Sequence, residues 1–472
     1  MVDLLFRSCK LDSLSSQKLA ALPIWRPFGY GSAIAISNIQ DADPDRWANF
    51  SNVDQYKQAI EVCKLPETFK DAVTITRNLG LRYLWIDSIC IIQGEGGDFS
   101  NEAKRMEHVF SQADCVLAAS SAKSQWDGFL NSRKTRDYVT LEQSGKPPIC
   151  ISEWIDDFEQ YALQSHLNHR GWVLQERALA RRTIYFTSRQ CFWECGRGVR
   201  CETLTKMDNT LASFLGDPNF PTVALEFSHG GKIMLFQELY KVYSSLEFTH
   251  DEDRPIAIAG LEKRLIQSFG VHGGFGILDG KDLGLLRRSL LWCRAPKEAS
   301  LSKIKFGVNA SLKGENGVPP PPTWSWMAYK GKIGYLEPPF AKMKWEKDEI
   351  LSPWSNPPAG TWYSSDPGKG LIGLSVIVRD FEVRVTLKND ETIEYDTTAN
   401  DGGPRPGLKC VVLGREEDPE KAVRDRIHYV MLLTPGSPQV IRGGPIYERA
   451  GVGKVLGSRI KLGQPGTLAR AY

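Results

Sequence analysis

Apolar positions between Phe69 and Leu79 recur every three or four residues, which is the spacing of one face of an amphipathic helix. Pro66 stands just before this pattern and Gly80 just after it. Proline is favoured in the first turn of a helix and glycine directly after the last turn. The sequence therefore predicts a helix over residues 66–80.

The pattern changes directly after this helix. Residues 83–86 are aromatic and β-branched without alternation, as expected for a short strand buried on both faces of a parallel sheet. Helical spacing returns in residues 99–114, and residues 115–121 again resemble a buried strand. Alternation of helix and strand predicts an α/β layer with crossover connections.

A short helix is predicted over residues 171–180, followed by strands at 183–187 and 190–195. Farther along, helical spacing is clearest in residues 233–246 and 283–293. Beyond residue 323 the chain has runs rich in β-branched residues, separated by Gly, Pro and Asp turns, which indicates a β-rich unit.

Four consecutive prolines end a stretch that breaks regular structure, because proline fixes φ and removes a backbone donor. The predicted organisation is a divergent or truncated N-terminal segment over 1–59, an α/β domain over 60–210, a helical segment over 211–314, a Pro-rich linker over 315–322 and a β-rich unit over 323–472.

Composition narrows the class of protein. The chain has 472 residues, of which 42% are hydrophobic and 24% charged, the balance of a folded globular protein. Its formal charge is only +3 and it has no long basic run, so nucleic acid is not an expected partner. There is neither a secretory signal pattern nor an apolar stretch of the roughly 20 residues that a spanning helix needs. We expect a cytoplasmic protein without a transmembrane segment.

Asp87 and Cys90 stand at the end of the buried strand "LRYLWIDSIC". Ligands of open α/β sheets bind beyond the carboxyl ends of the strands, so Asp87 is a candidate ligand contact. The alternative is that its carboxylate accepts backbone N–H groups of the following loop, which is the commoner use of aspartate. Cys90 is interpreted as an apolar core residue, because no histidine stands nearby in sequence to activate it.

A metal site is not predicted. Cys191, Cys195 and Cys201 are close in sequence, but their spacing differs from that of zinc motifs and no histidine lies within residues 170–228. We interpret them as core cysteines on strands. Trp324 and Trp326 could bind a ligand, but packing of the β-rich unit against the helical segment is the favoured interpretation.

Three groups of stretches follow one another in this order: "LPETFKDAVTITRNLGLRYLWIDSICIIQ", then "NEAKRMEHVFSQADCVLAASSA" with "DGFLNSR", and then "RGWVLQERALARRTIYFTSRQCFWEC". Together they resemble the fungal heterokaryon incompatibility (HET) domain. Downstream stretches such as "PPTWSWMAYKGKIGY" resemble the region that follows the domain in large fungal HET proteins, so the resemblance spans about residues 60–455. It implies a role in non-self recognition and regulated cell death, through self-association and protein partners in incompatibility signalling.

HET domains also resemble Toll-receptor-type (TIR) domains remotely, and some TIR domains cleave NAD at the nicotinamide glycosidic bond. The resemblance thus implies a TIR-like parallel-sheet fold, no cofactor, and NAD as a substrate. "RGWVLQE" is similar to the segment that carries the catalytic glutamate of these relatives, which makes Glu176 the candidate catalytic carboxylate. Trp85, Asp87, Arg170 and Trp172 are the implied substrate-binding residues.

Purely structural roles are the alternative for two of these residues. Glu176 could be an exposed helix residue paired with a neighbouring arginine, and Trp172 a core anchor.

HET domains usually begin with a strand resembling "YVALSYVWG", and we find no such motif in this chain. Either residues 3–8 substitute for it or the central strand is lacking, which would leave ladder groups unpaired. Two alternatives to the enzyme therefore remain, namely a non-catalytic adaptor and an inactive, truncated HET paralogue.

Overall fold

The structure is a computed structural model of residues 1–472. It describes residues 19–20, 33–37, 47–94, 96–103, 105–133, 136–195, 198–207, 229–280, 284–298, 300–306, 320–354, 373–383, 387, 390–397, 407–436 and 445–472. The chain forms two compact units. Unit 1 comprises Met1–Val223 with Ile256–Leu261, and unit 2 comprises Ala224–Pro255 with Glu262–Tyr472.

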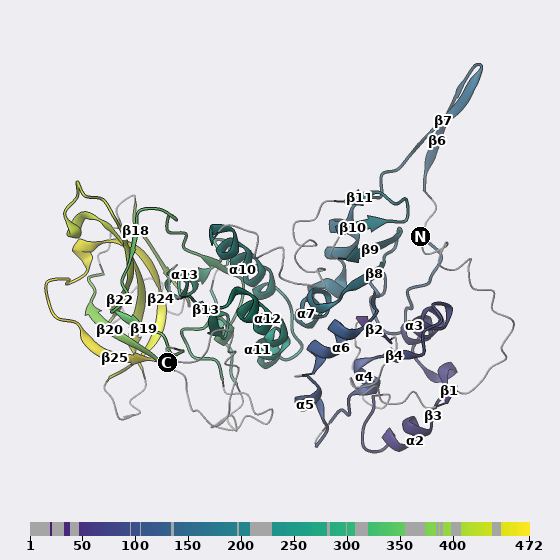
Figure 1. The fold of residues 1–472 in the computed structure, drawn as a ribbon, viewed down its shortest axis with the longest axis horizontal. Coiled ribbons are helices and arrows are strands. Elements are labelled where there is room, and N and C mark those ends of the chain that lie inside the picture. The colour runs from purple at the N-terminus through teal and green to yellow at the C-terminus, as the bar shows by residue number, and fades with distance from the viewer. Residues whose placement is uncertain are drawn as a thin grey trace. The chain divides into compact units, whose positions relative to one another are not determined.

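Unit 1 is built on a seven-stranded sheet with the order β11-β10-β9-β8-β5-β2-β4 (Figure 1). Its first four strands in the chain, β2, β4, β5 and β8, are parallel to one another, and β9, β10 and β11 continue the sheet in antiparallel fashion. The strands are β2 (Ala33–Ser37), β4 (Tyr83–Trp85), β5 (Cys115–Ala118), β8 (Arg182–Phe186), β9 (Cys191–Cys195), β10 (Gly198–Cys201) and β11 (Lys206–Met207).

Helices cover both faces of the parallel strands (Figure 1). On one face, α3 (Glu67–Asn78) packs Phe69 and Ile75 into a cluster with Ile34 and Leu117. On the other face, α6 (Met106–Gln112) and α7 (Gly171–Leu179) contribute to a cluster that contains Trp85. This is a three-layer α/β arrangement, and the predicted mixed α/β class is confirmed.

Strand β2 corrects an expectation from the sequence. Its five residues, AIAIS, are all buried, and it lies between β4 and β5 in the middle of the parallel strands. The prediction that a central strand is lacking is therefore wrong, because residues 33–37 supply it. Residues 3–8, the proposed substitute, lie outside the described part of the chain.

The helices predicted in unit 1 from periodicity are present, but their ends and continuity differ in places from the prediction. Gly80, with φ +70°, follows α3 in the left-handed conformation that favours glycine. The helix predicted over 99–114 is divided into α5 (Phe99–Ala103) and α6. The remaining short elements of unit 1 are β1 (Leu19–Ala20), α2 (Val53–Gln58), β3 (Ala59–Ile60), η2 (Val62–Lys64), α4 (Asp87–Cys90), η3 (Glu159–Leu163) and η4 (His166–His169).

A separate two-stranded hairpin, β6 (Tyr138–Gln143) and β7 (Lys146–Ser152), leaves unit 1 between β5 and α7. It stands away from the seven-stranded sheet (Figure 1). Neither of its strands pairs with that sheet.

Unit 2 begins with helices and small strand pairs. These are α10 (His229–Ser244), η5 (Asp251–Asp253), α11 (Arg254–Ala257), α12 (Ala259–Phe269), β12 (His272–Gly274), β13 (Ile277–Asp279), α13 (Leu285–Ser289), β14 (Trp292–Arg294), β15 (Ser302–Lys303), η7 (Trp326–Ala328), β16 (Tyr329–Lys330) and β17 (Ile333–Tyr335). Within α11 and α12, the segment Ile256–Leu261 belongs to unit 1. The helix predicted over 283–293 is only partly correct, because α13 ends at Ser289 and Trp292 begins β14, which pairs with β17.

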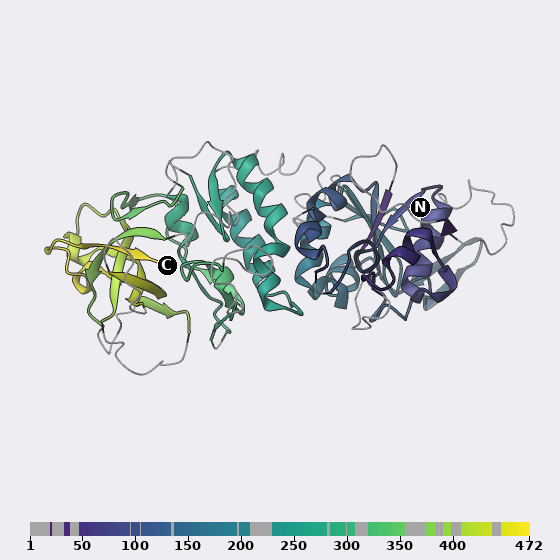
Figure 2. The same cartoon turned by 90° about the horizontal axis from the view of Figure 1, so that it is seen from below.

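An eight-stranded sheet completes unit 2. Its members are β18 (Met343–Trp345), β19 (Ile350–Leu351), β20 (Leu374–Asp380), β21 (Thr392–Tyr395), β22 (Lys409–Glu416), β23 (Ile427–Pro435), β24 (Ile446–Leu456) and β25 (Thr467–Ala471), with η8 (Val423–Asp425) and η9 (Gly457–Arg459) in the connections. Because β20 pairs with both β22 and β25, the sheet closes on itself. Figure 2 shows these strands in yellow and green. The β-rich C-terminal part is thus confirmed.

Aromatic side chains join the helices of unit 2 to its strands. Trp326 packs against Tyr240 and Tyr243 of α10, with ring centroids 5.2 and 6.0 Å apart. Trp324 packs edge-to-face against Trp354 and is fully buried. Packing, the favoured interpretation of the two tryptophans, is confirmed. None of the described helices is both long and apolar enough to cross a membrane.

Candidate functional site

The carboxyl ends of the parallel strands bring polar side chains to one edge of the sheet of unit 1. Ser37 is the last residue of β2, and Asp87 follows β4 after one residue. The N–H of Ala119, just beyond β5, donates to the carbonyl of Ser37 over 3.2 Å. The chain order of the four parallel strands across the sheet is second, first, third, fourth, so the order reverses at β2. Doubly wound sheets bind ligands at such a reversal.

Glu176 reaches the same edge from α7. Its side chain is buried, with 7% of the residue exposed, and its carboxylate accepts a hydrogen bond from the hydroxyl of Ser37. The two residues are 139 positions apart in sequence. The alternative of an exposed helix residue paired with an arginine does not describe this position, because Glu176 is buried and its hydrogen bond is made with a serine.

The surroundings of Glu176 hold its pKa near neutrality. Burial of the carboxylate raises the pKa to about 7. The hydrogen bond from Ser37 opposes this rise, the negative charge of Asp87 adds to it, and the positive charge of Arg170 opposes it. At neutral pH a substantial fraction of Glu176 is therefore ionised inside a buried environment.

Asp87 is half-buried and makes a local contact as well. Its Oδ1 atom accepts the N–H of Ser88 over 2.7 Å at the start of the four-residue helix α4. The structure thus supports the local role that the sequence left open. It also places the charge of Asp87 near enough to Glu176 to affect the pKa of that group.

Arg170 and the two tryptophans differ in their surroundings. Arg170 is half-buried at the N-terminus of α7, and its positive charge lowers the pKa of Glu176. Trp85 is 5% exposed and packs edge-to-face on Phe110, so its contacts are those of a core residue. Trp172 is half-buried and packs on Phe99 with ring centroids 6.1 Å apart. The substrate-binding roles given to these residues stay predictions.

Serine side chains beyond Ser37 are functional candidates that the sequence did not reveal. Ser88 follows Asp87, and Ser120 and Ser121 follow β5. In the described part of the chain their Oγ atoms are buried without a hydrogen-bond partner. Buried hydroxyls are normally paired, so these groups are suited to contact a polar ligand. The one sequence feature that could have identified these serines is their position shortly after buried strands.

Burial explains the inert character of Cys90. Removal of the thiol from water raises its pKa to about 12, so the thiolate is scarce at neutral pH. The interpretation of this residue as an apolar filler fits that environment.

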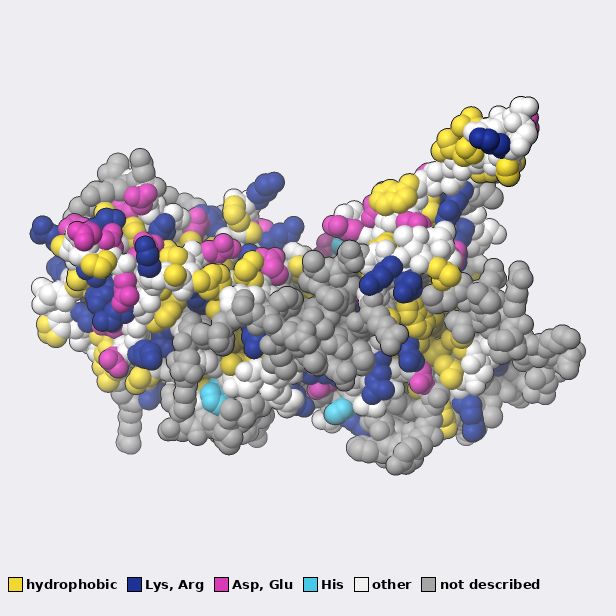
Figure 3. All heavy atoms as spheres, turned by 45° about the horizontal axis from the view of Figure 1, so that its top comes forward, with side chains coloured by type: hydrophobic (Ala, Val, Ile, Leu, Met, Phe, Trp, Pro, Cys, Tyr) yellow, Lys and Arg dark blue, Asp and Glu magenta, His cyan; other side chains and the backbone are white. Residues whose placement is uncertain are grey.

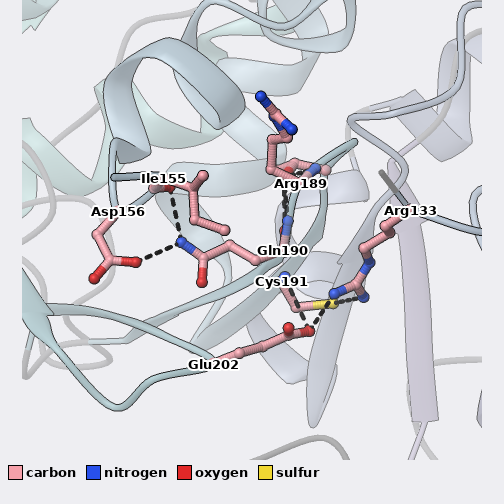
Figure 4. A network of polar contacts seen from close by, with 8 residues as sticks. Arg133, Ile155, Asp156, Arg189, Gln190, Cys191 and Glu202 are labelled. Atoms are coloured by element: carbon pink, nitrogen blue, oxygen red, sulfur yellow. Dashed lines mark hydrogen bonds and ion pairs between the residues drawn. The ribbon is translucent and has the colours of Figure 1, made fainter. Parts of the chain in front are cut away.

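Cys191 of β9 belongs to a different polar network (Figure 4). The guanidinium of Arg133 lies 3.0 Å from the sulfur of Cys191 and 2.5 Å from the carboxylate of Glu202. Beside it, the amide of Gln190 donates to the carbonyl of Ile155 and to Asp156 over 2.9 and 2.8 Å. These contacts join the β8–β9 turn to the segment before η3. Within the described residues, no group of three or more His, Cys, Asp or Glu side chains is arranged to hold a metal ion.

Comparison with known proteins gives one match. The model of the family described as "Heterokaryon incompatibility protein (HET)" matches residues 35–176. The match begins in β2, ahead of the predicted domain start at residue 60, and ends at Glu176, so it contains both partners of the Ser37–Glu176 hydrogen bond. Searches of curated proteins and of solved structures each returned no significant match. The resemblance to the heterokaryon incompatibility domain is thus confirmed over residues 35–176, which match the family model.

Proposed function

We propose that the HET domain of this chain hydrolyses the N-glycosidic bond between nicotinamide and ribose in NAD, with Glu176 as the catalytic carboxylate. Loss of NAD would then cause the cell death that accompanies heterokaryon incompatibility. The observation that carries the proposal is the buried Ser37–Glu176 pair at the carboxyl edge of the parallel strands. We also propose that the domain has a TIR-like fold.

The reaction needs few groups from the protein. As the bond from ribose C1′ to the nicotinamide nitrogen breaks, its electron pair leaves with nicotinamide and positive charge develops on the ribose. A fixed carboxylate beside the ring stabilises that charge more strongly than water does. Water then adds to C1′ and loses a proton, which gives ADP-ribose. Glu176 suits this role, because its carboxylate is held by Ser37 in a poorly hydrated position.

Other residues at this edge would contact the rest of the substrate. The charge of Arg170 suits a phosphate group, and the hydroxyls of Ser88 and Ser120 suit the ribose hydroxyls. The face of Trp172 could stack on the nicotinamide ring. NAD is thus the substrate, and no separate cofactor enters the reaction.

The second candidate function is a non-catalytic adaptor that recruits proteins through its surface. The observation that favours it is the exposed β6–β7 hairpin, which has apolar side chains on its surface. An inactive paralogue would behave in the same way in assays of NAD.

Glu176→Gln separates the two functions. The variant keeps the volume of the side chain and a group that can accept the Ser37 hydrogen bond, but it lacks the charge. We expect wild-type protein to consume NAD and to reduce viability on expression, and Glu176→Gln to lose both. Glu159→Gln, the same change at an exposed carboxylate of unit 1, is the matched control and should keep both. Toxicity that persists in a folded Glu176→Gln protein would favour the adaptor.

A further inference from the structure

The β6–β7 hairpin is fully exposed along both strands. Every residue of Tyr138–Gln143 and Lys146–Ser152 is exposed, and the hairpin projects from unit 1 with hydrophobic side chains along it (Figure 3). An isolated two-stranded hairpin is only marginally stable in water, and it gains stability when further strands or a packing partner are added.

One face of the hairpin is aliphatic. The strands pair Val139 with Ile151 and Leu141 with Ile149, so these four side chains lie on the same face. Their exposed fractions are between 46% and 63%. The opposite face carries the polar pair Thr140 and Cys150, whose oxygen and sulfur are 3.8 Å apart. Aliphatic side chains at this exposure are typical of a surface that binds another protein.

The two outer edges of the hairpin differ. Strand β7 contains Pro147 and Pro148, which lack N–H donors, at a shift in the pairing register. Proline and register shifts are features by which proteins block strand addition. Strand β6 has no proline in its six residues. The hairpin therefore has one uninterrupted edge, that of β6.

The hydrogen bonds between β6 and β7 show which backbone N–H and C=O groups of β6 point toward β7 and which point outward. The N–H of Glu153 donates to the carbonyl of Asp137 over 3.1 Å, so this opposing pair is hydrogen-bonded. Such pairs alternate along antiparallel strands, so Val139 and Leu141 direct their backbone groups toward β7. Tyr138, Thr140 and Glu142 direct theirs outward.

We propose that two copies of this chain associate through the β6 edge, forming a four-stranded antiparallel sheet with a two-fold axis at Thr140. In this register Val139 lies opposite Leu141 of the second copy, so the two aliphatic faces become continuous. Glu142 lies opposite Tyr138 of the second copy and diagonal to its Arg136, which places opposite charges together. A parallel arrangement would instead place the two Glu142 carboxylates side by side.

The partner is a second copy because the pairing is self-complementary. The same edge serves both chains, and one open edge per chain closes the assembly at two copies. Strand addition of this kind relies on backbone hydrogen bonds for its stability. The hairpin lies apart from Ser37 and Glu176 in sequence, so this dimer does not depend on the proposed reaction.

Proline substitution at one edge tests the proposal. Sedimentation equilibrium of the full chain should show a dimer. Thr140→Pro removes an outward N–H from β6 without removing a bond to β7, and we expect a monomer. Ser152→Pro makes the same change at an outward position of β7 and should leave the dimer intact. A wild-type monomer at about 100 µM, or a dimer that persists in Thr140→Pro, would overturn the proposal.

Crosslinking tests the register. Directly opposed, hydrogen-bonded residues of antiparallel strands have Cα atoms about 5.5 Å apart, which suits a disulfide. Thr140→Cys in a Cys150→Ser background should therefore crosslink to a covalent dimer under mild oxidation, whereas Cys150→Ser alone should not. A dimer without this crosslink would overturn the two-fold axis at Thr140.

Discussion

The hydroxyl of Ser37 donates a hydrogen bond to the carboxylate of Glu176, which joins the end of the central strand β2 to the helix α7. Because Glu176 is buried, its ionised form depends on this bond and on nearby charges. Removal of each neighbour should therefore shift the pKa of the same carboxyl group in a known direction.

The pH dependence of NAD hydrolysis should follow the ionisation of Glu176. Burial raises the pKa of this group to about 7, and the ionised form is the active one in the proposed reaction. The rate constant kcat/KM should thus increase with pH and reach half its maximum near pH 7. A rate that is flat between pH 5 and 8 would contradict this role of Glu176.

Ser37→Ala should move this transition to higher pH. The hydrogen bond from Ser37 stabilises the carboxylate, so its loss raises the pKa of Glu176. A hydrogen bond to a charged group is typically worth enough to shift the transition by about one pH unit or more. The measurement is the pH profile of kcat/KM for the variant, and Ser37→Thr, which keeps the hydroxyl, is the control.

Asp87→Asn should have the opposite effect. The negative charge of Asp87 raises the pKa of Glu176, so its removal should move the pH profile to lower pH. The amide can still accept the N–H of Ser88, which preserves the start of α4. A shift to higher pH would show that the two carboxylates do not interact in this way.

Glu176→Gln should make the protein more stable at pH 8 than wild type. The folded protein raises the pKa of Glu176 from 4.5 to about 7, so between these values the folded state binds more protons than the unfolded state. The free energy of unfolding of wild type thus falls as pH rises through this range, by on the order of 3 kcal/mol relative to Glu176→Gln. Urea unfolding of both proteins at pH 5 and pH 8 checks the difference.

Sequence patterns predicted the elements whose hydrophobic spacing is regular. Helix α3 and strand β4 lie where the periodicity indicated, because one face of α3 packs on the sheet and β4 is buried within it. Strand β2 was missed. This strand has only five residues, AIAIS, and it lacks the motif with which HET domains usually begin.

The site could be predicted only in part. The similarity of "RGWVLQE" to a known segment pointed to Glu176, but nothing in the sequence connects it to Ser37, because their contact depends on the order of strands in the sheet. Trp85 was assigned a substrate-binding role through the comparison with TIR domains. The structure places its ring in the cluster under α6, packed edge-to-face on Phe110, and the sequence alone does not show on which face of the sheet this ring lies.

The buried ion pair between Arg177 and Glu194 should be essential for the stability of unit 1. Arg177 on α7 donates two hydrogen bonds, of 2.8 and 2.7 Å, to Glu194 on β9, and the Tyr185 hydroxyl donates to the same carboxylate. Glu194→Gln leaves a buried arginine without its countercharge and should cost about 3–5 kcal/mol of unfolding free energy. The double variant Arg177→Met with Glu194→Leu should lose less unfolding free energy than the sum of the losses from Arg177→Met alone and Glu194→Leu alone. Urea unfolding of wild type, these two single variants and the double variant measures the difference.

Ile34→Ala tests whether residues 33–37 form the central strand. Ile34 is 0% exposed, pairs with Leu84 on one side and Cys115 on the other, and packs in the cluster under α3. Loss of this side chain should leave a cavity and lower the unfolding free energy by about 2–5 kcal/mol. Phe50→Ala, at a residue that is 62% exposed, is the control and should change it by less than about 0.5 kcal/mol. Because a side chain on a loose N-terminal segment would contribute as little as Phe50, an equally small effect of Ile34→Ala would contradict the position of β2.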